Sequence, residues 1–143
     1  MLFRSNIIDT VREMSKVFKH NIVAIAVGLL VILLSVMPPS ELPKCKIHFA
    51  DKIVHLVMYF ALAASFFIGD LIQSKSLNID YRRIAFVLIF CSLFGGLLEL
   101  VQWFLPNRNT SIYDFLANIA GVLLAVIVNI VIYRIKKVKQ NKF

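Results

Sequence analysis

Glu99–Asn118, with the sequence ELVQWFLPNRNTSIYDFLAN, joins two long apolar stretches through a loop of a few residues. Such a short loop predicts that the two flanking stretches form antiparallel, neighbouring helices. Charged and amide groups inside a membrane are costly, and most of them pair with one another or serve a function. We therefore interpret this segment as part of a functional site. Its polar residues are Glu99, Gln102, Arg108, Asp114 and Asn118.

The rest of the chain is apolar enough for an integral membrane protein. Of its 143 residues, 59% are hydrophobic, and the mean hydropathy is +0.81. A soluble domain is about 45–50% apolar. Because the excess lies in four long runs, the sequence predicts an all-α, four-span transmembrane helical bundle. The predicted spans are 21–37, 51–69, 84–105 and 112–133 within a membrane domain 21–133, preceded by a basic amphipathic cytoplasmic segment 1–20 and followed by a basic cytoplasmic tail 134–143.

The formal net charge of +8 has a simple explanation in such a protein. The basic residues flank the apolar runs, where they meet anionic lipid headgroups, so we expect no nucleic-acid partner. Twelve of the 16 Lys and Arg residues fall in the first, third and fifth segments outside the spans. Positive residues favour the cytoplasmic side. The sequence thus predicts cytoplasmic termini and places Glu99–Asn118 at the extracytoplasmic end.

A second polar stretch, DKIVHLVMYF, opens the second predicted span. At about 100° per residue, its polar side chains lie on or near one helix face, and Glu99 and Asp114 lie on the polar faces of the third and fourth spans. Polar faces in a membrane pack toward the bundle interior. We expect one outward-facing pocket lined by Asp51, Lys52, His55, Tyr59, Glu99, Gln102, Arg108, Asp114 and Asn118.

Some of these features also have structural explanations. Asp114 follows Ser111 by three residues, a spacing typical of a capping box. Gly95 and Gly96 favour close helix packing over ligand contact. Glu99 and His55 are harder to explain by stability, because an apolar residue would cost less inside a span.

Three chemistries fit this residue set. His55 and Glu99, with Asp114, are candidate catalytic residues for general acid–base work. Arg108, Lys52 and His55 could bind a phosphate or carboxylate headgroup. The acids and His55 could hold a divalent ion, but no spacing specifies one, so we assign no metal and no cofactor. The candidate ligand-binding residues are Asp51, Lys52, Tyr59, Gln102, Arg108 and Asn118.

The order and spacing of these residues resemble the VanZ-like family. The matching patterns are D-K-x-x-H-x-x-x-Y from Asp51, E-x-x-Q from Glu99, and R-x-x-x-x-x-D-x-x-x-N-x-x-G from Arg108 to Gly121. The resemblance covers about residues 38–128 and implies a small protein of the bacterial inner membrane. The founding member, VanZ, is associated with low-level resistance to the glycopeptide teicoplanin.

Three functional hypotheses follow. The first is a cell-envelope protein that binds an anionic lipid, a lipid-linked wall precursor or a lipoglycopeptide. The second is an intramembrane enzyme that acts on a lipid headgroup with Glu99 and His55 as acid–base residues. The third is a small transport or assembly subunit. The expected partners are membrane lipids or a lipid-linked envelope precursor, with a homo-oligomer as a further possibility.

Overall fold

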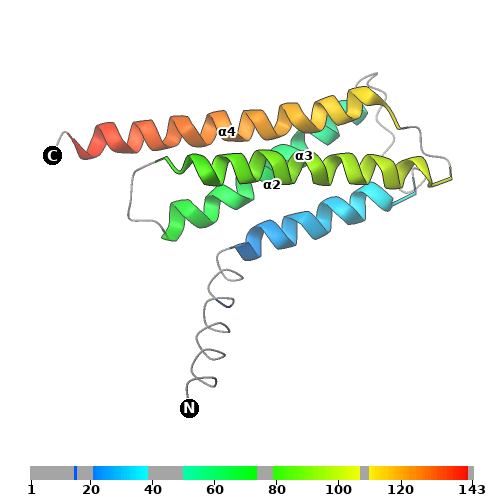
Figure 1. Cartoon of the computed structure of the whole chain (residues 1–143), viewed down its shortest axis with the longest axis horizontal. Coiled ribbons are helices and arrows are strands. Elements are labelled where there is room, and N and C mark those ends of the chain that lie inside the picture. Colours follow the sequence, from blue (N-terminus) through cyan, green and yellow to red (C-terminus); the bar gives the residue numbers. More distant parts are fainter. Residues whose placement is uncertain (1–14, 16–20, 39–49, 74–78, 107–109, 142–143) are drawn as a thin grey trace, which may run out of the picture.

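The computed structural model describes residues 15, 21–38, 50–73, 79–106 and 110–141, and its regular secondary structure in these residues is helical. The predicted amphipathic segment 1–20 lies almost wholly outside these residues, as does Arg108. Figure 1 shows the helices lying beside one another with alternating chain direction. Their bounds are Asn21–Val36, α2 Ala50–Gln73, α3 Tyr81–Trp103 and α4 Ile112–Gln140.

Three of the four predicted spans are confirmed as helices long and apolar enough to cross a membrane, namely α2, α3 and α4. The helix Asn21–Val36 is also apolar but shorter. At about 1.5 Å per residue it is roughly 24 Å long, against a hydrocarbon core of about 30 Å. The fourth crossing therefore stays a prediction.

The helix ends differ from the sequence prediction by several residues. α2 continues past Gly69 to Gln73, and α3 begins three residues before the predicted Ile84 because Asp80 caps it. The Asp80 carboxylate accepts hydrogen bonds from the backbone N–H groups of Arg82 and Arg83 at 3.0 and 3.3 Å. A carboxylate at this position satisfies donors that the first helical turn leaves free.

α4 does not end at Tyr133, where the apolar run stops, but continues to Gln140. The added turns are exposed and rich in Lys, a good helix former. Lys137 and Lys139 lie in the last turn, where positive charge favours the helix dipole. Most of the predicted basic tail is thus a continuation of the fourth helix.

Close packing of α2 against α4 depends on Gly121. α4 makes its most extensive helix contact with α2. A Cβ atom built on Gly121 would overlap the carbonyl oxygen of Leu56 and lie 2.9 Å from the backbone nitrogen of Phe60. Only a residue without a side chain lets the two backbones approach this closely. This contact brings the first turns of α4 against those of α2.

At the end of the bundle where α3 begins, Arg83 joins three helices. Its guanidinium donates to Asn21 Oδ1 at 2.6 Å and to the carbonyl oxygen of Phe66 at 3.4 Å. It also lies 5.5 and 5.8 Å from the ring centres of Phe66 and Phe86. Arginine combines directed hydrogen bonds with stacking on aromatic faces, so this contact fixes the helices at that end.

Candidate functional site

The predicted polar residues gather at the opposite end of the bundle. The first turns of α2 and α4 and the last turns of α3 meet there, at the right of Figure 1. His55 is 5% exposed, Asp114 2% and Asn118 1%. Side chains buried to this degree are normally hydrogen-bonded, so their partners define the site.

A chain of hydrogen bonds links α3, α4 and α2 within this site. The Asn118 amide donates from Nδ2 to Glu99 Oε1 at 3.3 Å, and its Oδ1 lies 3.0 Å from His55 Nδ1. His55 Nδ1 is also 3.5 Å from Glu99 Oε1. One buried amide thus bridges the acid and the imidazole that the sequence singles out as catalytic candidates.

Asp114 has a different role from the predicted capping box. Ser111 is the N-cap of α4, and its hydroxyl accepts a hydrogen bond from the Tyr113 N–H at 3.2 Å. The Asp114 carboxylate pairs with Lys52 across the α2–α4 contact, with Lys52 Nζ 3.3 Å from Asp114 Oδ1. Because Asp114 is buried, water screens the attraction between the two charges less than at the surface, and removing Lys52 would leave a buried carboxylate without its partner.

The remaining predicted residues lie apart from this network or outside the described chain. Gln102 is buried and donates to the carbonyl oxygen of Ser35 at 3.0 Å, which ties α3 to the helix Asn21–Val36. Tyr59 is 1% exposed, and its hydroxyl has no hydrogen-bond partner among the residues described. A Cβ on Gly95 would lie 3.0 Å from the Tyr59 ring, so this glycine makes room for the ring.

The structure also reveals a groove that sequence patterns did not predict. It has a volume of about 300 Å³ and lies between the end of α3 and the start of α4. Glu99 lines it, although only 13% of that side chain is exposed. Glu99 Oε2 has no hydrogen-bond partner in the described chain. The other lining residues are Gly96, Leu100, Trp103, Thr110, Ser111, Ile112 and Phe115.

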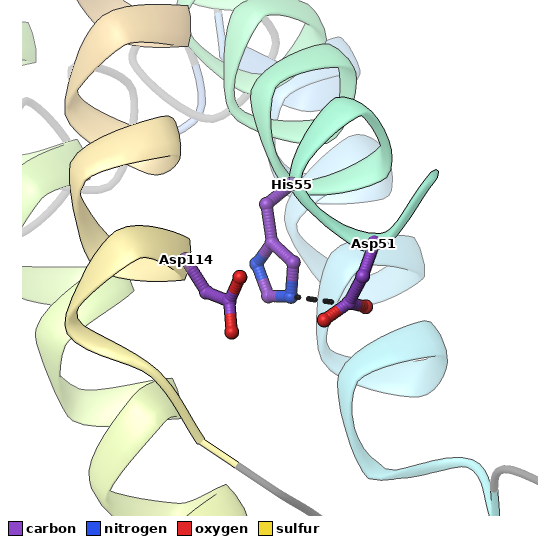
Figure 2. A group of neighbouring side chains, drawn as sticks. All are labelled: Asp51, His55 and Asp114. Atoms are coloured by element: carbon purple, nitrogen blue, oxygen red, sulfur yellow. Dashed lines mark ion pairs between the residues drawn. The ribbon is translucent and has the colours of Figure 1, made fainter. Parts of the chain in front are cut away.

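Asp51, His55 and Asp114 form a second group, which shares His55 with the hydrogen-bonded network (Figure 2). One ring nitrogen of His55 and one oxygen from each acid lie within 4.8 Å of one another. The His55 Nε2 to Asp51 Oδ1 distance is 3.9 Å, which is too long for a hydrogen bond. Such an arrangement of one imidazole and two carboxylates is able to hold a cation.

The fold and this site define a helical membrane protein with a polar centre at one end of its bundle. The chain belongs to the VanZ/LLP1 family, whose family model matches residues 3–135. It is also similar to an uncharacterized protein of Schizosaccharomyces pombe, C11E3.10, with 29% identity over 105 residues. That match covers 71% of this chain but 60% of the yeast protein, so the chain spans less than two thirds of its relative. No solved structure matches the chain.

Proposed function

We propose that the protein binds the headgroup of a membrane lipid at the polar end of its bundle. The observation that carries this proposal is that Glu99 belongs both to the groove and to the hydrogen-bonded network. Its side chain lines the groove and is also hydrogen-bonded to Asn118, and its second oxygen has no partner among the residues described. A lipid in the groove would lie against the Glu99 side chain, and a rotation of its carboxyl group would turn the buried oxygen toward the headgroup.

The walls of the groove suit an alkyl chain. Leu100, Trp103 and Ile112 are more than half exposed, on helices with long apolar faces. In a bilayer these faces meet lipid tails. Thr110 and Ser111 give the groove a polar rim, where a headgroup can form hydrogen bonds.

The yeast relative bears on which ligand is chosen. A fungus has no peptidoglycan, so a ligand shared with that relative would be a lipid headgroup and not a bacterial wall precursor or a lipoglycopeptide. The described cluster contains Asp51, Glu99 and Asp114 but one cation, Lys52. An anionic headgroup therefore needs a further positive charge beside it, from Arg108 or from a bound cation.

A second function, catalysis on that headgroup, is favoured by the contact between His55 and Glu99. General acid–base work requires two titratable groups within hydrogen-bond reach of the reacting atoms. Glu99 lines the groove while Asn118 holds His55 beside it. Glu99 would exchange a proton with the headgroup in the groove, and His55 would act as its acid–base partner.

Filling the groove tests lipid binding. In Gly96→Leu, the added side chain enters the groove, since a Cβ there meets Phe115 at 3.5 Å. We expect at least a tenfold loss of the lipid that copurifies with the protein, measured by native mass spectrometry. Gly28→Leu is the matched control, because Gly28 lines a wholly apolar groove of about 180 Å³ away from the polar cluster. Equal loss in both variants would contradict a specific lipid site.

Glu99→Gln separates binding from catalysis. The amide keeps the shape of the side chain but cannot act as an acid or base. If the protein is an enzyme, this variant should keep the copurifying lipid and lose turnover of it. Loss of the lipid itself would instead assign Glu99 to binding alone.

We propose a bacterial inner-membrane location with the polar end extracytoplasmic, as the distribution of basic residues predicts. The chain has two cysteines, and Cys91 is fully buried. A membrane-impermeant thiol reagent added to intact spheroplasts should therefore label Cys45. Labelling only after permeabilisation would reverse the orientation.

A further inference from the structure

We propose that Asp51, His55 and Asp114 bind one divalent transition-metal ion. Their three potential ligand atoms lie within 4.8 Å of one another, and the imidazole lies between the two carboxylates (Figure 2). Zinc–nitrogen and zinc–oxygen bonds are about 2.0–2.2 Å long, so ligand atoms around one ion are about 3–4 Å apart. Small side-chain rotations would complete the site.

The hydrogen bonds around His55 determine which of its nitrogens is free. The Asn118 amide donates from Nδ2 to Glu99, so the Asn118 atom that faces His55 is its oxygen. Both neighbours of His55 Nδ1, Asn118 Oδ1 and Glu99 Oε1, are acceptors. The hydrogen of a neutral imidazole therefore lies on Nδ1, and Nε2 carries a lone pair. This pattern, an acceptor behind Nδ1 and a ligand at Nε2, is common in metal-binding histidines.

Nε2 then faces an acceptor and not a donor. Asp51 Oδ1 is 3.9 Å away, and a lone pair and a carboxylate oxygen repel each other unless a cation lies between them. His55 is 5% exposed and Asp114 is 2% exposed, so water screens the two groups poorly. A positive charge at Nε2, either a proton or a metal ion, removes this repulsion, and a metal ion would also engage Asp114.

The charge balance of the network supports the same conclusion. The polar cluster contains the carboxyl groups of Asp51, Glu99 and Asp114 and the ammonium of Lys52. A divalent ion at Asp51, His55 and Asp114 would offset this excess of acidic over basic side chains. Lys52 contacts one oxygen of Asp114, and its side chain is 34% exposed, so it can move toward solvent as the ion binds.

The donor set favours some ions over others. Imidazole suits Zn²⁺, Fe²⁺ and Ni²⁺, carboxylates suit Mn²⁺ as well, and Mg²⁺ and Ca²⁺ prefer oxygen ligands alone. We therefore assign the site to a first-row transition-metal ion, for which Zn²⁺ and Mn²⁺ are the test ions. If the lipid-binding proposal also holds, this ion would supply the positive charge that an anionic headgroup needs; metal binding itself does not depend on that proposal.

Direct metal titration tests the inference. The untagged full-length protein in detergent is stripped with EDTA and titrated with Zn²⁺ or Mn²⁺ alone in a calorimeter. We expect one ion per chain. Asp51→Asn and Asp114→Asn should each weaken binding at least tenfold. Asp51 is the safer variant for folding, because its side chain is 61% exposed.

Asp80→Asn is the matched control. It removes a carboxylate at the other end of the bundle, and asparagine caps a helix as well as aspartate does. The control should bind the ion like the unmodified protein. Less than about 0.1 ion per chain, or equal binding by all variants, would overturn the metal site. Full metal binding in Gly96→Leu together with loss of lipid would show that the metal and lipid proposals stand separately.

Discussion

The two ends of this helical bundle use polar residues in opposite ways. At one end, Arg83 brings a single cation to two oxygen acceptors and two aromatic rings. At the other end, Glu99, Asp51 and Asp114 bring carboxylates to one lysine and one histidine. At the first end, the Arg83 guanidinium has oxygen acceptors around it. At the second end, carboxyl oxygens outnumber the donors that Lys52 and His55 provide.

This difference helps to separate structural polar groups from functional ones. A hydrogen bond between membrane helices adds modest stability when both partners are satisfied. An acceptor left without a partner in a buried site costs stability, and a ligand can recover that cost. Glu99 Oε2 is such an acceptor among the residues described. We therefore expect substitutions at the Arg83 end to change stability and those at the acid-rich end to change binding.

The largest effect should come from Gly121→Val, which tests whether helix packing holds the acid-rich end together. The new side chain would collide with the backbone of Leu56 and Phe60, which cannot rotate away. We expect a loss of about 3 kcal/mol in the free energy of unfolding, and loss of metal binding with it. Circular dichroism during titration with SDS measures the first, and calorimetry the second.

Gly96→Ala is the control for Gly121→Val, because its Cβ would make an ordinary contact with Phe115 at 3.5 Å. It should unfold close to the unmodified protein. If Gly121→Val retained metal binding at full affinity, the α2–α4 contact would not be what assembles the site.

Arg83→Lys should have a smaller effect, confined to stability. Lysine keeps the charge but lacks the planar guanidinium, whose Nη2 donates to both Asn21 and Phe66 and which lies near two aromatic rings. We expect about 1–2 kcal/mol less stability in the same SDS titration. Arg82→Lys, at an exposed neighbouring position, is the control. A tenfold change in metal affinity in Arg83→Lys would show that the two ends are coupled and would break the comparison.

Gln102→Met should have the smallest effect and would refine the boundary of the site. It removes the hydrogen bond to Ser35 while keeping a side chain of similar length. Hydrogen bonds between membrane helices are worth about 0.6 kcal/mol on average. A stability loss of that order with unchanged lipid and metal binding would assign Gln102 to packing. Weaker lipid binding would instead support the sequence prediction that Gln102 is a ligand-binding residue.

The sequence predicted much of the fold because membrane helices leave strong local signals. Long apolar runs located α2, α3 and α4, and helical spacing grouped His55, Glu99 and Asn118 on interior faces. Helix ends were less predictable, because a helix can continue beyond its apolar run into water. The Lys-rich segment after Tyr133 is polar but still helical. The groove beside Glu99 was missed because it depends on where Leu100 and Phe115 meet across two helices, which one-dimensional spacing does not encode.

The length of α4 has a consequence for how deep the polar centre lies. The whole helix is 29 residues, or about 43 Å, which exceeds the hydrocarbon thickness of about 30 Å. Its apolar part, from Ile112 to Tyr133, spans roughly 33 Å at about 1.5 Å per residue. Exposed lysines beyond Tyr133 keep that end at one leaflet's headgroups. The length of α4 therefore fixes the depth of Asp114 and Asn118. Both lie within roughly 10 Å of the membrane surface of the other leaflet, where headgroups give way to acyl chains.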